Sequence, residues 1–323
     1  MSLILKTSPA FKDYLWGGTR LKTEFGKKCD LDKVAEAWEL SCHADGPCTI
    51  ANGVHAGKTL PEYLAAAQTD VLGTNCAAFD RFPILIKLID AKQSLSIQVH
   101  PDDSYAMRVE GEPGKTEMWY IVDCDPGAQL LYGFEHEISR EEFAARIQNN
   151  TLLDVVHAVP VHKGDVFFIT AGTLHAIGGG ILIAEIQQNS NTTYRVYDYG
   201  RVGADGKPRA LHIAQALDVT LRAPAAQPVT QGTVLSETAE CTDRLLASCR
   251  CFTVHALDVH GSTARTAGSE SFHSLLCTEC DGELTVHGPE NSITLRRGES
   301  AFVPAACGTY TVCGNGRVLL TTV

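Results

Sequence analysis

Two potential metal ligands, Gln98 and His100, lie two residues apart in the segment LSIQVHPDD. A β-strand points alternate side chains to the same face, so an extended backbone here directs both side chains toward one point. In GKTEMWYIV, Glu117 begins another strand-like run and shares its face with Lys115. The first segment therefore supplies two metal ligands, and the second presents a carboxylate together with a cation.

A further candidate ligand, His175, stands just beyond a strand-like run in GDVFFITAGTLHAIGGG. The run from Gly164 through Thr170 and Gly172 to His175 matches the second cupin motif, G-x5-P-x-G-x2-H, except that threonine replaces proline. Cupins are double-sheet jelly rolls, and their first motif supplies further ligands upstream. Two imidazoles, one carboxylate and one amide oxygen suit Zn²⁺, and Fe²⁺, Mn²⁺ and Co²⁺ also accept this set.

The segments that must position these residues read as strands, because alternating and β-branched runs dominate the sequence. Turns containing Gly, Pro and Asp join the runs, which argues against a parallel doubly wound sheet. Two helices are expected, one over 139–150, where Ser139 and Glu142 form a capping box, and one over 59–67. Strands are expected at residues 83–89, 95–100, 118–122, 166–170, 181–188, 274–280, 283–287 and 318–323.

The proline- and glutamine-containing stretch 222–232 has little that could pack and is expected to be a linker. We therefore expect a mainly β chain with two cupin-type jelly-roll β-barrels. The first, over 1–222, carries the metal site and a short helical insertion near 139–158, and the second covers 233–323. In the second, Gly298 to Pro304 repeats G-x5-P, but Cys307 and Gly308 lie where a ligand histidine is needed, and His273 has no matching carboxylate. It is expected to bind no metal and to be structural, with sugar binding or a dimer contact as alternatives.

The composition restricts the partners and the location. With 44% hydrophobic and 20% charged residues, the chain can bury a core and folds. A formal net charge of −11 argues against nucleic acid as a partner. No apolar run reaches the ~18–20 residues that span a bilayer, and the N-terminus lacks the order of a signal peptide, so we expect a cytoplasmic protein without a membrane partner.

Twelve cysteines in 323 residues are too few for a disulfide scaffold, so reduced thiols are expected. Two local pairs, Cys249-x-Cys251 and Cys277-x-x-Cys280, could begin a metal or redox site. No second pair or histidine follows at a zinc-finger spacing, and the second pair lies in a strand that runs into an Asp-Gly turn. Structural or incidental thiols are the favoured interpretation of both pairs.

Seven strings between residues 11 and about 215 carry a further signal. They are YLWGG (14–18), EAWELS (36–41), LSIQVHPD (95–102), GKTEMWY (114–120), AGTLH (171–175), EIQQNS (185–190) and TYRVYDYGR (193–201). In these strings and in their order the sequence resembles the type I mannose-6-phosphate isomerases, and more closely their short bacterial form. The resemblance implies reversible isomerisation of mannose 6-phosphate and fructose 6-phosphate, with zinc at Gln98, His100, Glu117 and His175.

Aldose–ketose interconversion moves a proton between C1 and C2 through a cis-enediol, so the site must stabilise an enediolate oxygen and supply an acid/base group. Arg195 matches the family's catalytic arginine, and its permanent charge can stabilise the oxyanion without titrating. The alternative for Arg195 is a surface ion pair with Asp198. Glu185 is the candidate acid/base.

The sugar phosphate, the expected small-molecule partner, needs cationic and hydroxyl contacts. Ser96 shares the strand face of Gln98 and His100 and matches a family phosphate contact. Lys115 is placed near the sugar, and Lys87 and Arg201 are further cationic candidates for the phosphate. Lys87 lies inside an apolar run, where an unpaired lysine is costly.

Two other functions fit part of the pattern. Two histidines and one carboxylate also form the Fe(II) triad of oxygenases, but Gln98 and the downstream Arg195 favour the isomerase. A sugar-phosphate-binding regulator without activity is the second alternative, and the presence of Arg195 and Glu185 argues against it.

Overall fold

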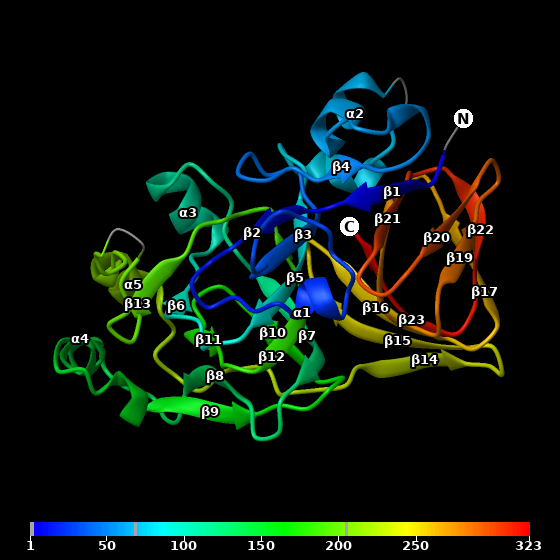
Figure 1. Cartoon of the computed structure of the whole chain (residues 1–323). Helices are drawn as coiled ribbons and strands as arrows, with labels where there is room; N and C mark the ends of the chain where they lie inside the picture. The colour runs from blue at the N-terminus through cyan, green and yellow to red at the C-terminus, as the bar shows by residue number, and fades with distance from the viewer. Residues whose placement is uncertain (1–2, 68–69, 204–205) are drawn as a thin grey trace. The chain divides into compact units, whose positions relative to one another are not determined.

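Strands make up most of the regular structure, as the alternating segments predict. The computed structural model describes residues 3–67, 70–203 and 206–323. Every predicted strand segment contains a strand: the apolar run at 83–89 becomes β5 (Ile84–Ala91), and the segment at 274–280 becomes β18 (His273–Cys280), which runs into the predicted Asp-Gly turn. The mainly β prediction is therefore confirmed, and Figure 1 shows the strands along the whole chain.

Both predicted helices are present. Helix α4 (Arg140–Gln148) begins after Ser139, whose side chain accepts the Glu142 N–H, but the Glu142 carboxylate binds Arg146. The complete capping box occurs instead at α2 (Leu60–Ala66), where Thr59 and Glu62 cap each other. Three further α-helices within the described residues were not predicted. They are α1 (Arg20–Thr23), α3 (Asp103–Val109) and α5 (Ile213–Val219).

Contacts divide the chain into two compact units, and the first comprises residues 1–12, 19–88 and 231–323. It contains an eight-stranded sheet in the order β14-β15-β16-β23-β18-β21-β1-β4 and a four-stranded sheet in the order β17-β22-β19-β20, with antiparallel pairing. Strands β2 and β3 pair separately from these sheets. The remaining elements of this unit are β1 (Leu5–Ser8), β2 (Ala10–Lys12), β3 (Glu36–Leu40), β4 (Thr49–Ile50), η1 (Gly53–His55), η2 (Thr74–Ala78), β14 (Thr233–Glu237), β15 (Cys241–Ser248), β16 (Thr253–Val259), β17 (Ser262–Ala267), β19 (Leu284–His287), β20 (Ser292–Leu295), β21 (Ser300–Val303), β22 (Gly308–Cys313) and β23 (Gly316–Thr322).

The second unit comprises residues 13–18 and 89–230 and contains the candidate metal ligands. A five-stranded antiparallel sheet has the order β13-β6-β11-β8-β9, and β10, β7 and β12 pair in that order in another sheet. The helical insertion predicted near 139–158 consists of α4 and a short 3₁₀ turn. The elements are β6 (Ile97–Val99), β7 (Glu117–Cys124), β8 (Gln129–Phe134), η3 (Leu152–Asp154), β9 (Val156–Pro160), β10 (Val166–Ile169), β11 (His175–Ile177), β12 (Ile181–Gln188) and β13 (Tyr194–Tyr197).

One face of the five-stranded sheet packs into a hydrophobic core. Ile97 and Val99 are fully buried there. The ring centroids of Phe134 on β8 and Phe143 on α4 lie 5.6 Å apart in an edge-to-face arrangement, which packs α4 against the sheet. Since neighbouring residues of a strand point to opposite faces, this packing turns Gln98 to the other face. No helix of the described residues is long and apolar enough to cross a membrane.

Candidate metal centre

Strand register gathers the predicted residues on one face of the five-stranded sheet. Gln98 on β6 lies opposite His175 on β11 and, on its other side, opposite Arg195 on β13. Directly opposed residues of antiparallel strands point to the same face. Three residues that are far apart in the sequence thus become neighbours on three adjacent strands.

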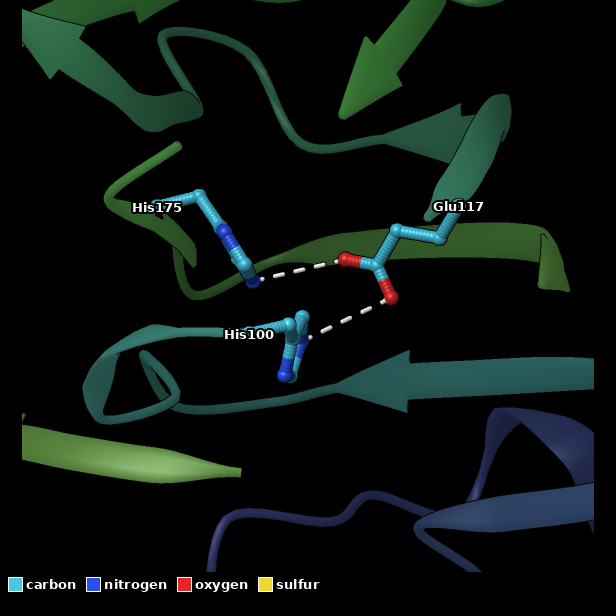
Figure 2. Close-up of side chains that lie close together, drawn as sticks. All are labelled: His100, Glu117 and His175. Atoms are coloured by element: carbon cyan, nitrogen blue, oxygen red, sulfur yellow. Dashed lines mark ion pairs between the residues drawn. The ribbon is translucent and has the colours of Figure 1, made fainter. Parts of the chain in front are cut away.

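Glu117, at the start of β7 in the other sheet of this unit, faces the two histidines. Its Oε1 lies 3.3 Å from His175 Nε2, and its Oε2 lies 3.7 Å from His100 Nε2. Figure 2 shows the three side chains converging from separate segments. All three are buried, and their candidate ligand atoms lie within 4.8 Å of one another. Two nitrogens and a carboxylate at this separation can hold one metal ion.

The backbone sets the orientation of both imidazoles. His100 Nδ1 lies 2.9 Å from the Thr192 carbonyl, and His175 Nδ1 lies 2.8 Å from the Thr173 carbonyl. A carbonyl only accepts, so each Nδ1 carries the hydrogen and each Nε2 presents its lone pair to the cluster. Burial lowers the pKa of His175 to about 4, which keeps this imidazole neutral, as a metal ligand must be.

Gln98 and Lys115 complete the surroundings of the three ligands. Gln98 Nε2 lies 3.4 Å from His175 Nε2, and rotation of the amide presents Oε1 there instead. The Lys115 ammonium lies 2.8 Å from Glu117 Oε2 and 3.2 Å from His100 Nε2. The structure thus brings together all four predicted ligands and the predicted lysine.

Glu185 lies beside this cluster on β12. Its Oε1 is 3.8 Å from the Lys115 ammonium, and its Oε2 accepts a hydrogen bond of 2.8 Å from the indole of Trp119. Trp119 and Glu185 are opposed across β7 and β12. Trp119 was not predicted as a site residue, although its spacing of two residues from Glu117 places it on the same face of the strand.

Arg195 contacts Ser96 within this unit. Its Nε donates to Ser96 Oγ at 3.2 Å, and its Nη1 donates to the Ala210 carbonyl at 3.0 Å. The alternative of a surface pair with Asp198 receives no support from these contacts. Burial is the main cause that lowers the pKa of Arg195 from its ordinary value, and the neighbouring Arg209 adds to it.

Asp198 is held by two other arginines. Arg201 binds its carboxylate, and Arg209 Nε donates to Asp198 Oδ2 at 2.7 Å. Arg201 also donates to the Ser94 carbonyl at 2.6 Å. The guanidinium groups of Arg201 and Arg209 share the single Asp198 carboxylate, so these three residues together carry a net positive charge near Arg195. Arg209 was missed because it lies beyond the matched strings.

Lys87 belongs to the other unit, on the part of β5 that precedes Ile89. Its ammonium lies 3.7 Å from Glu36 Oε2 and 5.1 Å from the centre of the Trp38 ring. These contacts provide the partner that a buried lysine requires. A role in phosphate binding stays a prediction.

The turn that delivers His175 requires glycine at position 172. Gly172 has φ +88°, and a Cβ there would lie 2.8 Å from Leu221 Cγ and 2.9 Å from the Val219 carbonyl oxygen. Left-handed backbone and the close approach of another segment both favour glycine. This explains the glycine that precedes the histidine in the motif.

Two family models match the chain. One, described as phosphomannose isomerase type I, catalytic domain, matches residues 4–118, and the other, described as mannose-6-phosphate isomerase, cupin domain, matches residues 242–323. Mannose-6-phosphate isomerase ManA of Bacillus subtilis (strain 168) is 37% identical over 308 residues, which cover 95% of this chain and 94% of the relative. The enzyme of Streptococcus mutans is also 37% identical, over 94% of this chain and 93% of its own length.

Solved structures agree with these matches. The crystal structure of mannose 6-phosphate isomerase from Bacillus subtilis superposes with a TM-score of 0.90 and 34% identity, covering all of both chains. The apo form of the isomerase from Salmonella typhimurium has 18% identity and a TM-score of 0.77 over 99% of both chains, which supports the fold. The chain therefore belongs to the type I phosphomannose isomerase family.

Proposed function

We propose that this chain interconverts mannose 6-phosphate and fructose 6-phosphate through a cis-enediol, with one divalent metal ion in the centre described above. The observation that carries this proposal is the buried cluster of His100, Glu117 and His175 beside Lys115 and Glu185, in a chain of this family. A metal ligand set, a cation and a second carboxylate are the groups that an aldose–ketose isomerase needs.

The residues of the centre fit zinc. Both Nε2 lone pairs and the Glu117 carboxylate point to one place, and rotation of the Gln98 amide would provide its oxygen as a fourth donor. Nitrogen and oxygen donors in this number suit Zn²⁺, with Fe²⁺, Mn²⁺ and Co²⁺ as competitors. When bound, the metal supplies Lewis-acid stabilisation of a substrate oxygen.

We assign the proton transfer to Glu185. The Trp119 indole fixes Oε2, so Oε1, turned toward Lys115, is the atom that would carry the proton between C1 and C2 of the sugar. Lys115 would keep Glu185 oriented and contact the sugar hydroxyls. Arg195 would stabilise the enediolate oxygen, because its charge is permanent and its sheet position is next to Gln98.

The phosphate end of the substrate is assigned to Ser96 with the neighbouring arginines. The Ser96 hydroxyl already lies in hydrogen-bond distance of Arg195, and Arg201 and Arg209 together exceed the charge of Asp198. A dianionic phosphate would be attracted to this excess charge. Lys87 remains a further candidate.

We place the catalytic residues in residues 1–222 and propose that 233–323 forms a metal-free cupin-like region. Twelve cysteines in 323 residues are below the density of a disulfide scaffold, and we propose the cytoplasm as the location. Nucleic acid and membranes are not proposed as partners of this acidic chain.

Metal removal tests this proposal. We expect the chelated protein to lose isomerisation of mannose 6-phosphate and to regain it as Zn²⁺ is added, up to one equivalent per chain. The Fe²⁺-loaded protein should isomerise without consuming O₂. Full isomerase activity of the metal-free protein would refute the role of the metal. O₂ consumption without isomerisation would refute the proposal and favour the oxygenase alternative.

A further inference from the structure

The hairpin loop between β15 and β16 places two cysteines, Cys249 and Cys251, close together. Strand β15 ends at Ser248 and β16 begins at Thr253, and these two residues pair across the ladder. The Cys249 N–H donates to the Phe252 carbonyl at 2.9 Å, which closes the loop. Both cysteines are therefore held at the end of a paired hairpin within one unit.

Cys251 contacts the Cys249 sulfur directly. The Cys251 N–H donates to Cys249 Sγ at 3.4 Å. Cys249 is half-buried, so a small reagent can reach it, whereas Cys251 is only 5% exposed. The arrangement provides an accessible attacking sulfur with a second thiol in reach of it.

The surroundings of Cys249 favour its thiolate. The hydrogen bond from the Cys251 thiol is the largest cause that lowers the pKa of Cys249 to about 6, and two backbone hydrogen bonds and the charge of Arg250 act in the same direction against burial. Arg250 also lies over the Phe79 ring at 5.3 Å. Because the thiolate is the nucleophile, Cys249 is prepared to react near neutral pH.

The second pair, Cys277 and Cys280 on β18, has the opposite character. Cys277 is fully buried, and its thiol donates to the Glu279 carbonyl at 3.5 Å, while the Cys280 thiol donates to the Gly282 carbonyl at 3.4 Å. Burial raises the pKa of Cys277. Donation of the Cys277 thiol to a carbonyl requires its protonated form, so the buried Cys277 is the matched control for Cys249.

We propose that Cys249 and Cys251 form a thiol–disulfide exchange site for low-molecular-weight, acidic disulfides. The Cys249 thiolate attacks one sulfur of the small disulfide, whose S–S bond breaks and releases one thiolate. Cys251 then gives its proton to solvent and attacks Cys249 Sγ, which expels the second thiolate. Two protein thiols are oxidised to one disulfide, and the small disulfide is reduced to two thiols. The charge of Arg250 favours an anionic disulfide.

Glutathione disulfide is the probe for this site. The reduced, full-length, metal-loaded protein is incubated with it, blocked with an alkylating agent and analysed by peptide mass spectrometry. We expect a Cys249–Cys251 disulfide in the wild type and a stable glutathione adduct on Cys249 in Cys251→Ser. Cys249→Ser should block both products, and Cys277→Ser should change neither.

The pH dependence of alkylation gives a second measurement on the unmodified protein. Between pH 7 and pH 9 the alkylation rate of Cys249 should change less than about two-fold, whereas a thiol with the ordinary pKa of ~8.5 accelerates about 25-fold. A rise of that size at Cys249, no exchange with glutathione disulfide, or a first adduct on another cysteine would each overturn the proposal.

Discussion

The two cupin motifs of this chain share a backbone frame and differ in chemistry. In the first motif Gly172 has φ +88° and His175 follows. The same spacing counted from Gly298 places Ala306, with φ +57°, at the glycine position. It places Thr309 at the histidine position, which corrects the expectation that Cys307 and Gly308 lie there. The left-handed turn is retained where the histidine is not. The turn therefore serves the fold, and the histidine serves the chemistry.

The two regions also differ in the polarity of their interiors. Across the described residues, His100, Glu117 and His175 are the one group of three His, Cys, Asp or Glu side chains that lie close enough together to hold a metal ion. The interior of the C-terminal region is a hydrophobic cluster, and His273 at its edge contacts the Tyr310 hydroxyl at 2.8 Å. Burying ligand groups without a metal costs desolvation energy, so only a region that uses them is expected to keep them.

The largest effect on turnover is expected at Arg195. A permanent cation next to the enediolate gains strength as charge develops, and its loss commonly lowers turnover on the order of 10²–10³-fold. Arg195→Ala should therefore lower kcat by this amount while the protein keeps its metal. Steady-state kinetics and metal analysis of the variant measure both.

Ser96→Ala is the matched variant for this prediction. The phosphate charge is similar in the ground and transition states, so loss of its contact should chiefly raise KM. If Arg195→Ala changed only KM, the arginine would belong to the phosphate subsite, and the account of enediolate stabilisation would be lost.

The buried charges of the other unit should act on stability. Lys27 Nζ lies 2.6 Å from Glu39 Oε1 and donates to the Gly298 carbonyl at 2.6 Å, while Ser300 donates to Glu39 Oε2 at 3.2 Å. Lys27→Met leaves the Glu39 carboxylate without its cation and should lower the free energy of unfolding by about 3–5 kcal/mol.

Denaturant unfolding of the metal-free protein measures this change. Lys28→Met, at an exposed neighbouring position, is the control and should change stability by no more than about 0.5 kcal/mol. Equal effects of the two substitutions would show that the buried pair does not stabilise this unit in the way the contacts indicate.

The smallest effect should distinguish the two turns. Gly172→Ala introduces left-handed strain and a clash with Leu221, and should destabilise by more than ~1–2 kcal/mol. Ala306→Gly relieves such strain at the second motif and should stabilise by about 0.5–1 kcal/mol after the entropy cost of glycine. Changes of the same sign at both turns would contradict a shared backbone frame.

The alternation of Gln98 with its apolar neighbours made much of the site predictable. Ile97 and Val99 enter the core, so Gln98 must face the opposite side, and the same rule relates Lys115 to Glu117. These inferences need only local strand geometry. Helix capping at α2 and α4 also depends only on residues that are close in the sequence, although the complete capping box is at Thr59 rather than at Ser139.

Contacts between distant segments were not predictable. The register that sets Gln98 between His175 and Arg195 depends on three strands meeting in one sheet, which no local pattern specifies. The Trp119 hydrogen bond to Glu185 likewise depends on the pairing of two strands. Helix α3 was missed because it is short and depends on one cap, the Asp102 side chain.

Metal stoichiometry tests the contrast between the two cupin regions most directly. The wild-type protein should bind one equivalent of transition metal per chain, His100→Ala/His175→Ala should bind none, and His273→Ala/Cys307→Ala should keep the full equivalent and isomerase activity near wild type. Full metal content in the first double variant, or loss of metal from a folded second double variant, would contradict the assignment of the metal to the first region alone.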